Sequence, residues 1–127
     1  MTLSAGQIAV SAGAPGAGGG PWFLRAVGDG MAPTIRPGDM AAVAPVSAWR
    51  GAGLYVVDAG MGPDLYRCDV VSSGRIALWR DNPAYARHEA TLAQFVDGVR
   101  GQVFGIMQIV DPSLLGGFAR NAGDDGQ

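Results

Sequence analysis

The apolar residues of this sequence occur in short runs, and glycine, proline, asparagine or aspartate interrupts almost every run. Short apolar runs bounded by turn-forming residues are typical of β-strands. No stretch of 15 residues shows the 3.6-residue periodicity of an amphipathic helix. The pattern therefore predicts a small all-β domain built from short antiparallel strands and hairpins.

The strands expected from this pattern cover residues 7–10, 22–27, 40–44, 54–58, 65–71, 75–80 and 102–110. The best hairpin joins 65–71 to 75–80, because Ser72-Ser73-Gly74 between them is a tight-turn sequence. Residues 60–64 and 31–37 are expected to turn, and 91–95 is either a helical turn or a strand. Gly105 inside the last strand indicates a bulge or a close approach of two backbones.

Composition divides the 127 residues into three parts. Residues 1–21 are rich in glycine, alanine, serine and proline and predict a flexible arm, because such a segment buries little apolar area. Residues 22–112 are expected to form one domain with one core. Residues 113–127 are expected to be a flexible C-terminal tail.

The charge and the apolar pattern limit the partners of the chain. The net charge is −2 and no basic stripe is visible, so we expect no direct binding of nucleic acid by this domain. No apolar run approaches the ~20 residues that cross a bilayer, and we expect no membrane partner. The single cysteine, Cys68, cannot form an internal disulfide, which favours a cytoplasmic location.

Residues 27–39 read Val-Gly-Asp-Gly-Met-Ala-Pro-Thr-Ile-Arg-Pro-Gly-Asp. Taken one by one, these residues are explained by two turns and two proline-stiffened loops. Their order is not explained in that way. The run resembles the Gly-Asp-Ser-Met-x-Pro-Thr-Ile-x-x-Gly-Asp signature of the LexA-like self-cleaving repressors and their signal-peptidase relatives.

Three further segments extend the resemblance over about residues 10–110. Residues 75–85 are similar to the family strand that ends in Asn-Pro-x-Tyr, and residues 99–106 are similar to its C-terminal Gly-x-Val-x-Gly strand. Ala12-Gly13 is similar to the peptide that self-cleaving members cut. The resemblance implies a LexA-like peptidase fold for residues 22–112. Its motif positions here are Gly28, Asp29, Met31, Pro33, Gly38 and Asp39.

The family chemistry needs a serine nucleophile and a lysine base, and the resemblance places Gly30 and Tyr66 at those two positions. Glycine has no oxygen to activate, and the chain contains no lysine. A phenol with a reference pKa of about 10 is a poor base at neutral pH. Arg67, the neighbour of Tyr66, is never deprotonated. The chain is therefore predicted to be a degenerate peptidase and not an enzyme.

Other catalytic arrangements have weaker support. Cys68 and His88 would be the only thiol-imidazole pair, and a buried structural cysteine is the simpler explanation of Cys68. One histidine and one cysteine show no metal-ligand spacing, so we expect no metal. The glycine run 16–20 lacks the ending of a phosphate loop, so we expect no cofactor.

The resemblance implies two remaining activities, both of them association. The C-terminal strand, with Val103, Phe104, Ile106, Met107 and Ile109, would pair with its copy in a homodimer. The alternative is a core strand without a partner. A cleft without a nucleophile would still bind an extended peptide, for example the arm around Ala12 and Gly13.

The predicted function is a catalytically inactive LexA-like domain for dimerisation or protein binding in phage-type or stress-type transcriptional regulation. The alternative is an active, or engineered-inactive, self-cleaving serine peptidase domain of a repressor.

Overall fold

The computed structural model describes residues 8–10 and 20–115, and within them eight strands form one sheet in the order β1-β2-β3-β8-β4-β5-β6-β7. Every neighbouring pair is antiparallel. The strands are β1 (Ile8–Val10), β2 (Trp22–Ala26), β3 (Met40–Ala44), β4 (Gly53–Asp58), β5 (Pro63–Val70), β6 (Ile76–Trp79), β7 (His88–Ala90) and β8 (Val99–Met107). One helix, α1 (Leu92–Gly98), and a 3-10 helix, Pro112–Leu115, complete the described elements. The predicted all-β class is confirmed.

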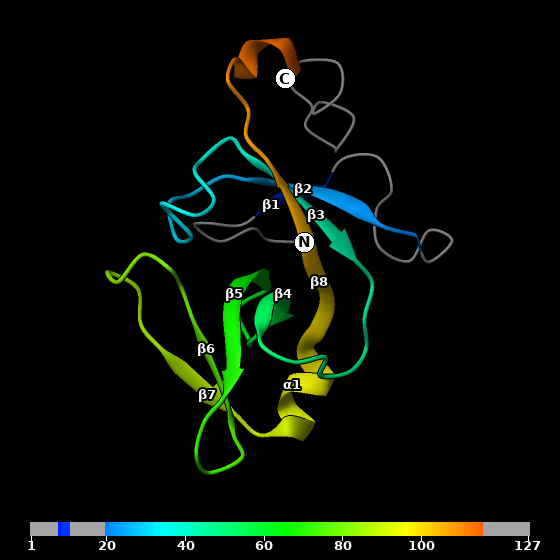
Figure 1. The fold of residues 1–127 in the computed structure, drawn as a ribbon, viewed down its shortest axis with the longest axis vertical. Coiled ribbons are helices and arrows are strands. Elements are labelled where there is room, and N and C mark those ends of the chain that lie inside the picture. Colours follow the sequence, from blue (N-terminus) through cyan, green and yellow to red (C-terminus); the bar gives the residue numbers. More distant parts are fainter. Residues whose placement is uncertain (1–7, 11–19, 116–127) are drawn as a thin grey trace.

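Strand β8 joins two groups of strands. Figure 1 shows β1, β2 and β3 crossing one end of β8, while β4 to β7 and α1 gather at the other end. β8 pairs with β4 through Val99–Gln102 and with β3 through Gln102–Met107. There are two buried clusters. The first lies mainly on β2, β3 and the segment between them but also includes Val56 of β4 and Leu65 of β5, and the second lies mainly on β4, β5, β6 and α1.

Two hairpins build the group that contains β4 to β7. The β4–β5 turn uses Gly60 and Gly62 at φ values of 110° and 93°, where a side chain would be strained. The Asp58 carboxylate accepts hydrogen bonds from both of their amides, at 2.8 and 3.2 Å. The β5–β6 turn uses Gly74 at φ 81°, which confirms the predicted tight turn and its hairpin.

Two bulges interrupt the pairing of β8. Against β3, Gly105 and Val103 are paired and Phe104 between them is left over. Against β4, the pairing skips Arg100. A bulge therefore does lie beside Gly105, as one of the two predicted options. The close approach belongs to Gly101, where an added Cβ would lie 2.4 Å from a Val43 methyl group.

Three expectations need correction or completion. Residues 91–95, left open between helical turn and strand, begin helix α1, with a capping box between Thr91 and Gln94. Strand β7 was not expected, because it has only three residues and they are largely exposed. The last strand begins at Val99 and ends at Met107, so the predicted span 102–110 was shifted and Ile109 lies beyond the strand.

Candidate functional site

The motif segment 27–39 connects β2 to β3 and folds back on both strands. Ala26 and Asp39 are joined by a 2.8 Å backbone hydrogen bond, and the Gly38 amide donates to the Ala26 carbonyl at 2.7 Å. Met31 and Ile35 are buried in the first cluster. The apolar motif residues thus anchor the loop that carries the glycine at position 30.

Asp39 fixes the end of the motif to the chain beyond β8. Asp39 is 4% exposed, and its carboxylate accepts the Arg36 amide at 3.0 Å and the Ile109 amide at 3.1 Å. Gly38 before it has a φ of 95°, which favours glycine. The Gly-Asp end of the motif therefore has a structural role that does not depend on catalysis.

Gly30 lies against the guanidinium of Arg80. A Cβ added at Gly30 would lie 2.5 Å from Nη1 of Arg80, so the arginine fills the space into which a side chain at position 30 would extend. Arg80 Nη2 donates to the Asp64 carboxylate at 2.9 Å, and these two side chains are only 11% and 3% exposed. The guanidinium carbon lies 4.6 Å from the centre of the Tyr66 ring. The structure thus brings Gly30 and Tyr66 together, with Arg80 between them.

The strand register explains this cluster. Alternate residues of a strand share a face, so Asp64 and Tyr66 of β5 point to the same side. Arg67 pairs with Trp79 of β6, and the next residue, Arg80, therefore follows on the face of Tyr66. A buried cation at this position needs a buried anion, and Asp64 supplies it.

The Asn-Pro-x-Tyr segment packs against the motif. The Asn82 amide donates to the Gly30 carbonyl at 3.0 Å, and the Asn82 side chain donates to the Asp29 carbonyl at 3.1 Å. The Tyr85 hydroxyl donates to the Asp29 carboxylate at 2.6 Å, and this bond raises the pKa of Tyr85. Two segments that carry the resemblance, more than 50 positions apart, therefore meet at one place.

A second ion pair lies beside the first. Arg67 donates from Nε and Nη2 to the two carboxylate oxygens of Asp81, at 2.6 and 2.7 Å. The Thr34 hydroxyl of the motif donates to the same carboxylate. The bond from Arg67 is the main cause that lowers the pKa of Asp81. Arg67 thus serves as a structural cation that links β5 to the motif.

Sequence reasoning missed Arg80, Asp64 and Asp81. Their signal was available only in part, as arginines and aspartates next to the predicted hairpin strands. The chemistry of the cluster follows from its members. It offers hydrogen-bond donors on a fixed guanidinium, and none of the side chains that meet at Gly30 is a hydroxyl nucleophile paired with an amine base.

Cys68 and His88 do not come together. Leu78 of β6 pairs with Cys68 on one side and with His88 on the other, so a whole strand lies between the two residues. Cys68 is fully buried, and desolvation raises the pKa of its thiol to about 12. The thiol therefore lacks the activation that a nucleophilic cysteine needs.

The residues predicted for a dimer strand are largely uncovered in the single chain. Phe104 is 63% exposed, Ile106 43% and Met107 47%, while Val103 is half-buried. Ile109 is half-buried beyond the end of the strand. The predicted cleavage-like peptide Ala12-Gly13 lies outside the described residues.

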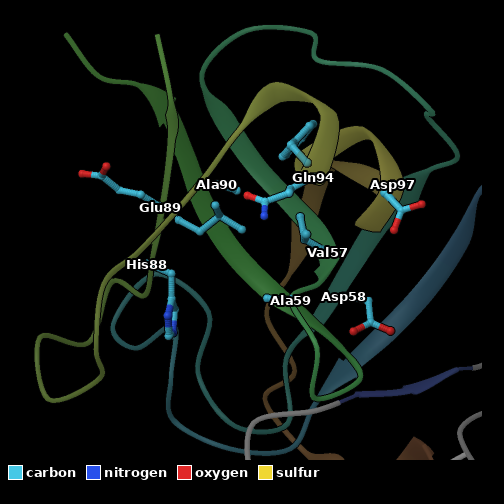
Figure 2. A pocket seen from close by; sticks show the side chains of 10 residues that line it. Val57, Asp58, Ala59, His88, Glu89, Ala90, Gln94 and Asp97 are labelled. Carbon is cyan, nitrogen blue, oxygen red and sulfur yellow. The ribbon is translucent and has the colours of Figure 1, made fainter. Parts of the chain in front are cut away.

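A cavity of about 350 Å³ lies between the end of β4, strand β7 and α1, away from the motif. Val57, Leu78 and Phe95 form its apolar part. Figure 2 shows the carboxylates of Asp58 and Asp97 turned away from Glu89, so the acids around it do not converge.

Comparison with family models and with curated proteins adds no relative. No protein-family model matches the chain, and no curated protein matches it either. Over residues 8–10 and 20–115, no histidine, cysteine and carboxylate groups gather as a metal site. Within the same ranges no helix is long and apolar enough to cross a membrane. The LexA-like resemblance therefore continues to depend on the motifs alone.

Proposed function

We propose that this chain is a catalytically inactive, peptidase-like domain that acts by association, as a homodimer and protein-binding module in phage-type or stress-type transcriptional regulation. The observation that carries the proposal is the position of Arg80. Its guanidinium lies against Gly30 and Tyr66, the two positions that the resemblance assigns to the nucleophile and the base.

Inactivity follows from charge as well as from the missing hydroxyl. A base must accept a proton, and a guanidinium does not release its own, so Arg80 cannot act as one. Its positive charge is held by the buried Asp64. A serine at position 30 would also have to displace Nη1 of Arg80 before it could reach a substrate. The loss of catalysis thus involves a new, stable ion pair in addition to two changed residues.

Association is supported by the second half of β8. From Val103 to Met107 this strand pairs with β3, and no described strand pairs with its other edge. Phe104, Ile106 and Met107 are exposed along it. An open edge with exposed apolar side chains promotes pairing with another chain. Antiparallel pairing of two β8 edges across a two-fold axis would satisfy both edges and cover these side chains.

The catalytic part of the proposal is tested by incubating the purified chain at mildly alkaline pH, the condition under which self-cleaving members of the family cut themselves. We expect the chain to remain intact by mass spectrometry. Two fragments produced by cleavage between Ala12 and Gly13 would contradict the proposal and favour the active-peptidase alternative.

The assignment of the two degenerate positions has a separate test. Gly30→Ser with Tyr66→Lys restores the family pair, and Arg80→Leu with Asp64→Asn removes the ion pair that would obstruct it. Cutting at Ala12-Gly13 in this fourfold variant supports the assignment. The matched control keeps Gly30 and carries the other three changes, and it should not cut. A folded fourfold variant that stays intact counts against the assignment.

The association part is tested by measuring the molar mass of the chain by light scattering as it elutes from a size-exclusion column. We expect a dimer whose population rises with concentration. A strict monomer over the whole accessible concentration range would contradict it. The regulatory part is tested in the coding region upstream of Met1, where a helix-turn-helix sequence is expected.

A further inference from the structure

Arg80 has hydrogen-bonding capacity that its own fold does not use. A guanidinium carries five N–H donors. Nη2 donates to Asp64, whereas Nε is fully buried without a partner. Nη1 has no hydrogen-bond partner among residues 8–10 and 20–115. Buried donors are normally satisfied, so a partly used guanidinium in a protected place requires an explanation.

The acceptors on Gly30 and on the residues next to Gly30 and Arg80 in the chain are already engaged. The Asp29 carboxylate accepts the Tyr85 hydroxyl, and the Gly30 carbonyl accepts the Asn82 amide. The Asp81 carboxylate is held by Arg67 and Thr34. Nε is fully buried, so Nη1 is the donor of Arg80 that remains for a ligand.

The guanidinium is also held in place. Its carbon lies 4.6 Å from the Tyr66 ring centre and 5.2 Å from the Tyr85 ring centre, at cation–π distances. Asp64 holds Nη2 at 2.9 Å. Binding a ligand at Nη1 would therefore cost little side-chain entropy, because the arginine is ordered beforehand.

We propose that Nη1 of Arg80, beside the bare backbone of Gly30, binds a carboxylate of a peptide ligand. A carboxylate is favoured over a neutral carbonyl because a charge-assisted hydrogen bond is about twice as strong. Gly30 has no side chain, so its backbone lies directly against Nη1, and Nη1, unlike Nε, is not fully buried. This inference rests on the proposed protein-binding function. A catalytic domain would need the space beside position 30 for the hydroxyl of its nucleophile.

The test is a nuclear magnetic resonance titration of the full chain, with the Nε–Hε signal of Arg80 and the amide signal of Gly30 as reporters. N-acetylglycine and its amide probe a terminal carboxylate. N-acetylaspartate N-methylamide and the matching asparagine compound probe a side-chain carboxylate. We expect a saturable shift at both reporters with one or both acids and none with the amides. Equal shifts with the acids and the amides, or no shift, would overturn the proposal.

Two variants test the position of the site. In Gly30→Ala the new Cβ would lie 2.5 Å from Nη1 and displace it, while the charge and the Asp64 pair remain. We expect affinity for the acid to fall about tenfold or more, as loss of a charge-assisted hydrogen bond implies. Arg80→Gln should abolish binding. The control Arg75→Gln removes an exposed cation that is paired with Glu89, and it should leave the affinity unchanged.

The outcomes separate this inference from the proposed function. Unchanged affinity in a folded Gly30→Ala variant would overturn the carboxylate site and leave the association function standing. Cleavage of the chain at alkaline pH would overturn the proposed function whatever the titration shows. Equal loss in Arg75→Gln and Arg80→Gln would show general charge attraction and also overturn the site.

Discussion

The two halves of β8 are parts of one strand in different surroundings. The first half, Val99–Gln102, pairs with β4, and its residues Val99 and Gly101 are buried. The second half, Val103–Met107, pairs with β3 and exposes most of its apolar side chains. β8 therefore joins the two strand groups through both of its halves (Figure 1), and the second half also has apolar surface available for a partner.

Each half contains one glycine. The glycine of the first half is tightly surrounded, whereas the glycine of the second half has room beside it. A Cβ at Gly101 would lie 2.4 Å from a Val43 methyl group, 2.7 Å from the Trp22 ring and 2.8 Å from the Ala44 carbonyl. A Cβ at Gly105 would lie 3.6 Å from Ala42 Cβ, an ordinary contact. Identical residues in one strand thus have unlike roles, and packing decides which of them is required.

The largest expected effect is that of Gly101→Ala. Because three rigid groups surround the added methyl group, we expect the free energy of unfolding to fall by about 3 kcal/mol, at the upper end of overpacking effects. Gly105→Ala is the matched control, with an expected change of less than about 1 kcal/mol. Urea denaturation of both variants gives the comparison. Equal losses would show that the two halves are packed alike.

Asp39→Ala has the next largest expected effect, because it removes the hydrogen bond between the motif and Ile109, two residues beyond the end of β8. The buried carboxylate accepts the Ile109 amide, and loss of hydrogen bonds to a charged group costs about 1.5–3 kcal/mol. We expect urea denaturation to show a loss of about 2 kcal/mol, and hydrogen exchange at Ile109 to accelerate. Asp97→Asn, on the exposed side of α1, is the control. An unchanged rate of hydrogen exchange at Ile109 would show that Asp39 does not hold the chain beyond β8 to the motif.

The strands were predictable where the signal is local. Residues 40–44 were predicted with the bounds of β3, and the β5–β6 hairpin follows from the Ser-Ser-Gly turn. Helix α1 was left undecided because seven residues make too few turns for a periodic pattern. Its capping residues, Thr91 and Gln94, were the readable signal for its start.

The candidate site was predictable only in part, for a related reason. The motif assigned positions to Gly30 and Tyr66, but local sequence does not show that Arg80 lies between them. That placement depends on the register of β5 with β6 and on the buried partner Asp64. Both are long-range features, which a pattern of neighbouring residues does not contain.

Phe104→Asp tests the second half as a partner surface. Phe104 is 63% exposed, so the monomer should keep its stability by urea denaturation. A charge in the proposed interface should weaken the dimer by about 1–2 kcal/mol, or roughly 5- to 30-fold, as expected for a central aromatic residue. The control is Met61→Asp in the β4–β5 turn, a residue that is 82% exposed and lies toward the Val99 end of β8, away from its second half. Analytical ultracentrifugation measures both. Equal weakening would place the interface elsewhere.

The smallest expected effect concerns a link between the strand groups that does not use β8. Arg67 and Thr34 hold the Asp81 carboxylate, and its pKa is lowered, chiefly by Arg67. A lowered pKa in the folded state means that the stabilisation is present above the unfolded value of about 3.9 and is lost as the pH falls through the folded value. Asp81→Asn should therefore melt below wild type at pH 7, and the difference should shrink below about pH 4. The effect is modest because Arg67 is 37% exposed. A difference in melting temperature that stays constant from neutral to acid pH would show that this ion pair does not contribute to holding the two groups together.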